Sequence, residues 1–427
     1  MAIEKMGLRT YGVGHKPHAS FVKAGRWVFA NGIRALDEHG VVHPSVLRED
    51  RPLNAPPRAE REARFIFDIL GDGFAAANSS LANVVRVDQY YPDWRTVDPY
   101  HSVRRQALGK VVAPSTSIIV DGLMNQDALV EVQALAFTKE SNIKAEPLAP
   151  KKVGGPAESG YAPCLLVDDL VFVAGQLARD DSGDIAPQAR VPDTQFWRGT
   201  RIRLETRYMV EHRLKPALEA AGSSLDLILK AQVYLSHPED FPMFMQVWCD
   251  AFESAVPPTT VVPVRHPALG TKEATIEINV IAASTRAKAR VQDVKCDVPL
   301  ISNRMLPARR LDDLLFVAGL MAVDEGGLVP EARPEPTAPY YKSGIELQTA
   351  DILRKAEKIF AAAGTDLANV ARAIHFHADL GDFAGACNAW RQVIGNDALP
   401  YSAVKVNESM FVPGAKLILD LWGHLPS

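Results

Sequence analysis

Two glutamates stand out because each lies in an otherwise apolar, strand-like run. Glu131 is flanked by valines and Glu277 by isoleucines. A carboxyl group that is buried needs a partner, and burial raises its pKa toward the range in which it can transfer protons near neutral pH. Glu131 and Glu277 are therefore candidate catalytic residues. The alternative is that each side chain lies on the outer face of its strand and meets solvent.

A pair of histidines forms a second candidate group, in the segment HFHADL. Strand alternation places His375, His377 and Asp379 on one face and Ile374 with Phe376 on the other. We expect the apolar face to pack on helices and the histidines to face a surface between domains, where they would bind substrate. Two histidines and a carboxylate are half of a metal site, but the rest of a ligand set is missing, so no metal is predicted. Structural hydrogen bonding is the alternative.

Three hydroxyl residues recur in similar short segments and are candidate substrate-binding residues: Thr116 in PSTS, Thr260 in PPTT and Ser402 in PYS. Their hydroxyl groups would orient water or bind a polar ring at the mouth of a cleft. They are equally compatible with ordinary strand positions, because β-branched residues favour strands.

These residues belong to a sequence that repeats three times. The glycines of a recurring hairpin, Gly32, Gly175 and Gly319, are 143 and 144 positions apart. Three further landmarks recur in the same order: a helix end (AAANSSLANVV, LEAAGSSLDLIL, FAAAGTDLANVA), the hydroxyl segment, and a closing strand (LVEVQALAF, TIEINVIAA, KLILDLWGH). Ordered landmarks at a fixed spacing indicate tandem repeats. The predicted domains span residues 1–140, 155–286 and 300–427.

Each repeat predicts the same elements. An alternating apolar run with a Gly-containing turn is typical of a hairpin. A helix follows, with apolar residues at helical spacing from Ile352 to Ala363 and a stop at Gly364. A strand, a second helix and two closing strands complete the repeat. The order β-β-α-β-α-β-β, with both helices on one face of the sheet, predicts a two-layer α+β domain.

A sheet covered on one face by helices leaves its other face to bury. Three copies can pack these faces together around a pseudo-threefold axis. We therefore expect an internal pseudo-trimer in one chain, with three clefts between neighbouring repeats. The polar connections at residues 139–160 and 286–300 are interpreted as linkers.

Composition narrows the function. The 427 residues carry a net charge of −4 and four scattered cysteines, without CxxC spacing. This charge provides no electrostatic attraction for nucleic acid or an anionic membrane. No apolar run reaches ~18 residues, so a cytoplasmic location is expected. Nucleotide, zinc-protease and serine-hydrolase motifs are missing, which favours chemistry without a cofactor. Trp248, Trp390, Cys249 and Cys387 are predicted to be buried.

With these residues in hand, the chain resembles the Rid family, the YjgF-like enamine/imine deaminases. The hairpin segment VFVAGQ and the closing segment TIEINVIA of the second repeat carry the resemblance most closely. It extends over nearly the whole chain, once per repeat. Ordinary members are homotrimers with active sites between subunits, so the resemblance implies a covalent version of such a trimer.

The resemblance also assigns site residues. A tyrosine upstream of the first strand corresponds to Tyr161, with His18 and Met305 in the other repeats. Tyr161 or His18 would polarise the reacting nitrogen or carbonyl. Backbone amides near the hairpin glycines Gly175 and Gly32 would contact the substrate. The closing-strand glutamate corresponds to Glu131 and Glu277, and to Ile418 in the third repeat.

One family feature is missing. The position of the family arginine holds Thr116, Thr260 and Ser402. A guanidinium binds a carboxylate through two charge-assisted hydrogen bonds, which a hydroxyl group does not replace. Either another residue supplies the cation, or the substrate has no carboxylate at that end.

The leading hypothesis is a cofactor-independent hydrolase that deaminates a small imine, enamine or amino-muconate-like molecule. A ring-opening amidohydrolase of the cyanuric acid hydrolase or barbiturase kind is an alternative. That class uses serine–lysine pairs, and here Ser402 and Lys405 are an odd number of residues apart, on opposite strand faces. A non-catalytic small-molecule-binding protein is the third hypothesis. Partners beyond a small molecule are not expected, and further self-association of the pseudo-trimer stays open.

Overall fold

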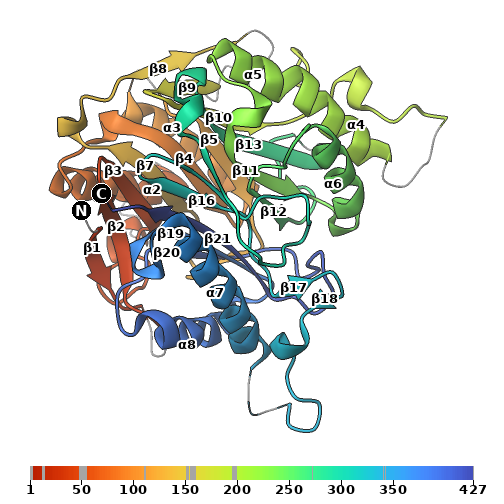
Figure 1. Ribbon diagram of the computed structural model, residues 1–427. Coiled ribbons are helices and arrows are strands. Elements are labelled where there is room, and N and C mark those ends of the chain that lie inside the picture. Colours follow the sequence, from red (N-terminus) through yellow and green to blue (C-terminus); the bar gives the residue numbers. More distant parts are fainter. Residues whose placement is uncertain are drawn as a thin grey trace.

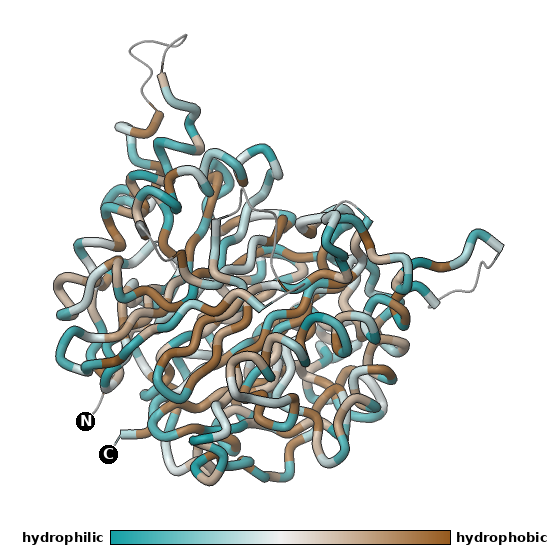
Figure 2. The backbone as a smooth tube through the Cα atoms, turned by 90° about the horizontal axis from the view of Figure 1, so that it is seen from above, coloured by the Kyte–Doolittle hydropathy of each residue, from teal (hydrophilic) through white to brown (hydrophobic). Residues whose placement is uncertain are grey.

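The computed structural model describes residues 3–11, 15–47, 55–109, 112–150, 153, 160–194, 200–271, 273–339, 341 and 343–426. Three mixed β-sheets lie at the centre of the molecule and the longer helices lie on its outside (Figure 1). Figure 2 shows the same arrangement by hydropathy, with apolar strands in the interior and polar loops at the periphery.

The first sheet has the strand order β1-β2-β3-β7-β4-β5. Only the pair β4–β5 is parallel among its pairs. Two long helices, α2 and α3, belong to this repeat. The strands are β1 (Glu4–Arg9), β2 (His18–Ala24), β3 (Trp27–Ile33), β4 (Val84–Tyr91), β5 (Ser115–Ile119), β6 (Gly122–Leu123) and β7 (Glu131–Phe137), and the helices are α1 (Pro44–Leu47), α2 (Arg58–Ala76) and α3 (Val97–Leu108).

The second sheet repeats this order as β8-β9-β10-β13-β11-β12. Its long helix contains a π-helical turn, Val210–Leu214, between α4 and α5. Turns of this kind are frequent at functional sites. The strands are β8 (Ala145–Leu148), β9 (Cys164–Val167), β10 (Leu170–Gln176), β11 (Ile228–Leu235), β12 (Thr259–Pro263) and β13 (Ile276–Ala283), and the helices are α4 (Thr200–Met209), α5 (Lys215–Ala220) and α6 (Phe241–Asp250).

The third sheet has the order β14-β15-β16-β21-β19-β20-β6, so that β6 of the first repeat completes it. A short hairpin, β17 with β18, stands apart from this sheet. The strands are β14 (Gln292–Val294), β15 (Ala308–Leu311), β16 (Leu314–Val317), β17 (Val323–Asp324), β18 (Gly327–Leu328), β19 (Val370–His377), β20 (Tyr401–Lys405) and β21 (Leu417–His424), and the helices are α7 (Gly344–Ala363) and α8 (Phe383–Ile394).

One buried cluster joins the inner faces of all three sheets. It includes Phe29, Phe172 and Phe316, which occupy the same position in the three repeats and are at most 1% exposed. Burying three such faces against one another removes a large apolar area from water. The predicted fold class is confirmed: three two-layer α+β units pack as a pseudo-trimer within one chain.

The end of the long third-repeat helix also matches its prediction. Helix α7 ends at Ala363, and Gly364 adopts the left-handed conformation with φ of 85°. The two helix tryptophans Trp248 and Trp390 are fully buried, and Cys249 and Cys387 are buried free thiols. These side chains fill the layer between helices and sheet, as their apolar neighbours indicate.

The connections between repeats contain more structure than the sequence predicts. Strand β8 lies within the first connection and β14 within the second, and each forms the edge of the sheet that follows it. An edge strand pairs through its backbone groups and needs no apolar pattern. The polar composition of these two segments therefore gave no sign of a strand.

The predicted orientation of the histidine pair is wrong. Phe376 packs against Tyr90 of the first repeat, with ring centroids 6.1 Å apart. His375 and His377 instead contact Phe383 of α8. Both histidines are fully buried under the helices, because the apolar face of β19 is needed at the centre of the pseudo-trimer.

Candidate active site

A cavity of about 460 Å³ lies in the seam between the first and second repeats. This volume suits a small molecule. Strands β5 and β10 face each other across this seam. The lining residues are Trp94, Arg95, Val97, Asp98, His101, Arg105, Ser115, Ser117, Ile119, Tyr161, Gly175, Leu177, Arg179, Ala268, Leu269, Gly270 and Glu277.

Glu277 projects from β13 into this cavity and is 5% exposed. Burial raises the pKa of Glu277 to about 7, and the nearby Arg179 cation and the Gly270 amide offset part of this rise. A carboxyl group with this pKa exists in both protonation states near neutral pH. Glu277 is thus able to donate and to accept a proton under physiological conditions.

Gly175 lets the carboxyl group of Glu277 occupy its place. A Cβ atom at position 175 would lie 2.0 Å from Glu277 Oε1, which is far inside van der Waals contact. The hairpin glycine at this seam therefore has a steric reason to be glycine, and the carboxyl group lies directly against the β10 backbone.

Tyr161 lines the cavity beside Glu277. Burial raises the pKa of its phenol, with the Glu277 carboxyl adding to the rise and Arg179 opposing it. Tyr161 is therefore a neutral hydrogen-bond donor at neutral pH. The guanidinium of Arg104 stands 6.0 Å from its ring centroid.

The first repeat supplies the opposite wall through a chain of polar contacts. His101 Nε2 lies 3.0 Å from Ser117 Oγ, which donates to Gln89 Oε1 over 3.2 Å. Arg104 Nη1 donates to the same Gln89 oxygen and to Ser115 Oγ. Burial, together with the Arg104 and Arg105 cations, lowers the pKa of His101 to about 2. The imidazole of His101 is therefore neutral, and its role in this wall is the hydrogen bond with Ser117.

Arg104 occupies a position that holds tryptophan in the other two repeats. Trp248 donates through Nε1 to Thr259, and Trp390 donates through Nε1 to His375. Arg104 keeps the donor role with its bonds to Gln89 and Ser115 but adds a buried positive charge. The seam that holds the cavity, called the open seam below, thus has a guanidinium cation behind Tyr161. The equivalent positions of the second and third repeats hold the indole groups of Trp248 and Trp390.

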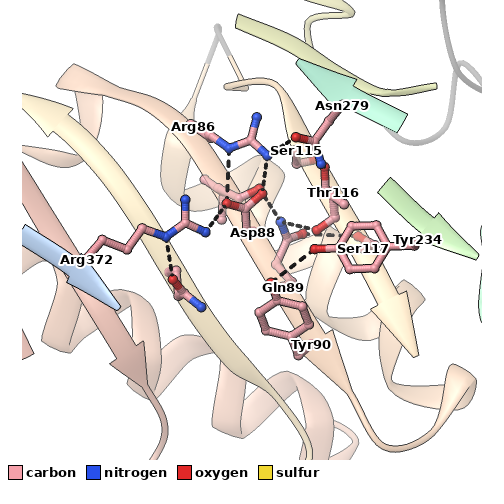
Figure 3. A network of polar contacts seen from close by, with 12 residues as sticks. Arg86, Asp88, Gln89, Tyr90, Ser115, Thr116, Ser117, Tyr234, Asn279 and Arg372 are labelled. Carbon is pink, nitrogen blue, oxygen red and sulfur yellow. Dashed lines mark hydrogen bonds and ion pairs between the residues drawn. The ribbon is translucent and has the colours of Figure 1, made fainter. Parts of the chain in front are cut away.

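A buried network connects this wall with the pseudo-threefold axis (Figure 3). Asp88 accepts hydrogen bonds from Arg86 of its own strand and from Arg372 of the third repeat, and Arg86 also donates to Asn279 of the second. Thr116 accepts from Asn279 over 3.0 Å, so its side chain faces the axis. Its neighbours Ser115 and Ser117, on the other face of β5, line the cavity.

Among the described residues, the corresponding seam between the third and first repeats is filled by side chains that pair with one another. Ser402 Oγ donates to Glu131, and Arg34 Nε stands 3.4 Å from the other carboxylate oxygen. His18 Nε2 lies 2.9 Å from the carbonyl oxygen of Tyr401. Glu131 and His18 are fully buried. Here the predicted acid–base residues are held by protein groups.

The side chain of Tyr401 explains part of this closure. It stands against His18, with ring centroids 4.6 Å apart, whereas the equivalent residue in the open seam is Ser115. A Cβ atom at Gly32 would lie 2.8 Å from the Tyr401 carbonyl oxygen. At Gly32 the backbone of the neighbouring repeat therefore comes close to the hairpin, whereas at Gly175 the nearest atoms belong to the Glu277 side chain.

The seam between the second and third repeats is also packed. The Gly319 amide donates to the Thr259 carbonyl over 3.1 Å, and Thr260 donates to Asp420 near the axis. Met305 fills the position that Tyr161 has in the open seam and is 5% exposed. With Ile418 in place of the glutamate, this seam lacks the acid–base group.

The structure brings together Glu277, Tyr161 and Gly175 of the predicted set in one cavity. It places Glu131, His18, Gly32 and Ser402 in a second seam, and His375 and His377 under helix α8. Sequence reasoning missed Arg179 and His101. Arg179 lies four residues after the hairpin glycine, in GQLAR, and its proximity to the glycine was the available signal.

Three domains of this α+β type, closed around a pseudo-threefold axis and with a ligand-sized cavity in a seam, define a Rid-type pseudo-trimer. The family described as Endoribonuclease L-PSP matches residues 154–284 and 301–417, and the chain belongs to this family. The earlier resemblance to the Rid family is confirmed.

Individual relatives match about one third of the chain. A RutC family protein of Saccharolobus solfataricus is 33% identical over 135 residues, which are 31% of this chain and 90% of that protein. The mitochondrial protein mmf2 of Schizosaccharomyces pombe is 35% identical over 130 residues, which are 30% of this chain and 89% of that protein. The crystal structure of yeast Mmf1 matches with 22% identity and a TM-score of 0.28, covering 33% of this chain and 100% of that one.

The described residues also carry two negative findings, on membrane-spanning helices and on metal-binding clusters. None of their helices combines the length and apolar character that crossing a membrane requires. Within the same residues, no group of three or more His, Cys, Asp or Glu side chains is arranged to hold a metal ion.

Proposed function

We propose that this protein is a hydrolase that deaminates a small imine or enamine in the cavity between its first and second repeats. The observation that carries the proposal is Glu277, a buried carboxyl group with a pKa of about 7 that faces a cavity of about 460 Å³. Membership of the family supports a small-molecule function.

Glu277 would transfer the protons of the reaction. In its acid form it protonates the imine nitrogen, which makes the carbon electrophilic. Water then adds to that carbon and returns a proton to the carboxylate, giving a carbinolamine. Glu277 protonates the amino group, the C–N bond breaks, and the hydroxyl proton returns to Glu277. The products are a carbonyl compound and ammonia, and the carboxyl group is regenerated.

Tyr161 and the backbone amides of β10 would donate hydrogen bonds to the oxygen atom that water adds to the carbon and that becomes the carbonyl oxygen. The phenol is neutral because burial raises its pKa, so it remains a donor throughout the neutral pH range. Donors that are already oriented stabilise developing charge without reorganisation. His101, Ser117 and Gln89 would hold the opposite wall and orient the attacking water.

We propose structural roles for the residues of the filled seam. Glu131 is occupied by Ser402 and Arg34, and His18 by the Tyr401 carbonyl group. These groups would hold the third repeat against the first. The fusion of three domains in one chain permits this division, because each seam varies independently.

Two other functions have less support: the ring-opening amidohydrolase considered from sequence, and the nuclease that the family description names. Ser402 donates to Glu131, while Lys405 lies 3.1 Å from Glu408 on the exposed side. This separates the serine and lysine that an amidohydrolase of the cyanuric acid type would need. A nuclease, which the family description names, would bind a polyanion, and a net charge of −4 does not favour that.

Ammonia release from imines generated in situ by an amino acid oxidase tests the proposal. We expect Glu277→Gln to lower turnover by ~10²-fold or more, because the amide neither donates nor accepts the transferred proton. Glu131→Gln is the matched control, since it is the same substitution at the same strand position of the filled seam. Equal rates for wild type and Glu277→Gln would reject Glu277 as the proton-transfer group.

A further inference from the structure

Two arginines near the pseudo-threefold axis share a single carboxylate. Arg86 of the first repeat and Arg372 of the third each lie 2.7 Å from an oxygen of Asp88, and all three side chains are at most 5% exposed. Among the residues that the structure describes, no other carboxylate lies within ion-pair distance of either guanidinium group. A buried cation normally has its own counter-charge, so this group has one positive charge that is not compensated.

The equivalent position of the second repeat is balanced. Lys230 is the third residue of β11, as Arg86 and Arg372 are of β4 and β19. Its Nζ lies 2.6 Å from Asp420 and donates to the Thr260 hydroxyl over 2.7 Å. Lys230 and Asp420 thus balance each other, and the excess charge stays with the two arginines.

Each of the two guanidinium groups has one nitrogen without an acceptor. Arg86 donates through Nε and Nη2 to Asp88, and through Nη2 also to Asn279. Arg372 donates through Nε to Gln133 and through Nη2 to Asp88. Within the described part of the chain, Nη1 of both arginines accepts no such role. Figure 3 shows both groups beside the Asp88 carboxylate, each with a nitrogen that no dashed line reaches.

Both arginines line a cavity of about 10 Å³. This is the space of about one water-sized atom. Asp88, the apolar side chains of Phe29 and Leu135, and the indole of Trp422 also line it. The Arg372 guanidinium lies 4.5 Å from the ring centroid of Trp422, whose Nε1 also has no acceptor among the described residues. A cavity of this size admits a ligand of one heavy atom and excludes a polyatomic anion such as sulfate.

A monoatomic anion suits this cavity better than water does. Water offers an oxygen to Nη1 of each arginine but leaves the charge uncompensated, which is costly in a buried place. A halide ion accepts hydrogen bonds from any direction and neutralises the excess charge.

We propose that one chloride ion binds in this axial cavity, between Nη1 of Arg86 and Nη1 of Arg372. The ion joins the first repeat to the third and so stabilises the closed pseudo-trimer. This site is separate from the cavity of the proposed deaminase reaction, and the inference does not depend on that function.

Urea unfolding of the full chain tests the proposal through its chloride dependence. Sodium chloride replaces sodium gluconate at constant ionic strength, so that only the anion changes, and gluconate is too large for the cavity. An ion that binds only the folded chain stabilises it by mass action. The unfolding equilibrium constant should therefore fall ~10-fold for each ~10-fold rise in chloride above its dissociation constant. An unfolding equilibrium that is the same in chloride and in gluconate would overturn the proposal.

Crystals grown in sodium bromide locate the ion. Bromide has the charge of chloride and scatters X-rays anomalously. We expect an anomalous peak within hydrogen-bond distance of Nη1 of both Arg86 and Arg372. A water molecule at this place, or bromide peaks confined to the protein surface, would reject the axial site even if chloride stabilises the chain.

A charge substitution tests why the anion binds. Gln133 accepts a hydrogen bond from Arg372 Nε over 2.8 Å, so Gln133→Glu supplies the missing negative charge from the chain itself. We expect this variant to bind chloride ~10-fold or more weakly, because like charges repel strongly where water is excluded. Gln106→Glu adds the same charge at an exposed position of α3 and should keep the wild-type chloride dependence. An unchanged chloride dependence in Gln133→Glu contradicts the proposal, and the two wild-type experiments decide it if this variant does not fold.

Discussion

The carboxyl group of Glu277 rests directly against the backbone of Gly175, at a place where any Cβ atom would lie 2.0 Å from its Oε1. This contact joins the two landmarks of the second repeat, the hairpin glycine and the closing-strand glutamate. It holds the carboxyl group at the cavity wall, away from bulk water, which is the cause of its raised pKa.

Gly175→Ala should therefore displace the Glu277 carboxyl group. We expect a loss of turnover of about 10²-fold, since a misplacement of about 1 Å has this effect on a catalytic group. Gly71→Ala, in helix α2, is the control, because a Cβ atom there meets its nearest neighbour at 3.8 Å. Steady-state rates of both variants decide the point, and an alanine at 175 with full activity would contradict it.

Glu277 should also lower stability at high pH. Its pKa is about 7 in the fold against an ordinary value of 4.5, so the folded chain binds the proton more tightly. The stability that this proton confers is complete below about pH 4.5 and is lost as pH rises to 7. Glu277→Gln should thus gain up to about 3 kcal/mol relative to wild type at pH 8. Thermal unfolding at pH 4 and pH 8 measures this, and a gain that is the same at both values would contradict it.

The same group should set the pH dependence of the reaction. If the acid form of Glu277 starts the proton transfers, the rate falls as pH rises through about 7. The Arg179 cation lowers the pKa of Glu277. Arg179→Gln should therefore move this limb of the pH–rate profile to higher pH, and Arg179→Lys should leave it nearer the wild-type position. A limb that moves to lower pH in Arg179→Gln would show that the cation does not act on Glu277.

Glu131→Gln should have the opposite effect on stability from Glu277→Gln. Arg34 stands 3.4 Å from Glu131, and both side chains are at most 2% exposed. Removing the carboxylate leaves a buried guanidinium without its counter-charge, which costs about 3 kcal/mol or more. Urea unfolding at pH 7 gives the free energy, and ammonia release by the remaining folded protein should equal that of wild type. A stable variant without activity would place chemistry in this seam.

The histidine pair shows where strand patterns mislead. The alternating pattern predicts that Ile374 and Phe376 face the helices and that His375 and His377 face a surface between domains. In a pseudo-trimer both faces of each sheet are buried, so polarity no longer distinguishes them. Arg372 on the same face as Phe376 joins the axial network with Asp88 (Figure 3), and the histidines pack beneath α8. The alternation correctly predicts which residues share a face of the strand, but not which of the two faces points toward the helices.

The sequence by itself determined the threefold repetition, the order of elements in each repeat and the burial of the inner sheet faces. These follow from periods of apolar residues and from glycines at turns, which are local properties. It also singled out Gly175, as a recurring hairpin glycine, and Glu277, as a carboxyl group in an apolar strand, while the resemblance to the Rid family pointed to Tyr161.

Only the tertiary structure decided which seam holds a cavity and which cation faces it. The walls of each seam come from two repeats that are distant in sequence, and whether they touch depends on the volumes of side chains that meet across it. Tyr401 occupies the seam between the third and first repeats, and Met305 occupies the seam between the second and third. Ser115 and Tyr161 leave space in the seam between the first and second repeats. Arg179 enters that space from a loop, because Arg213 and Tyr208 hold its backbone there.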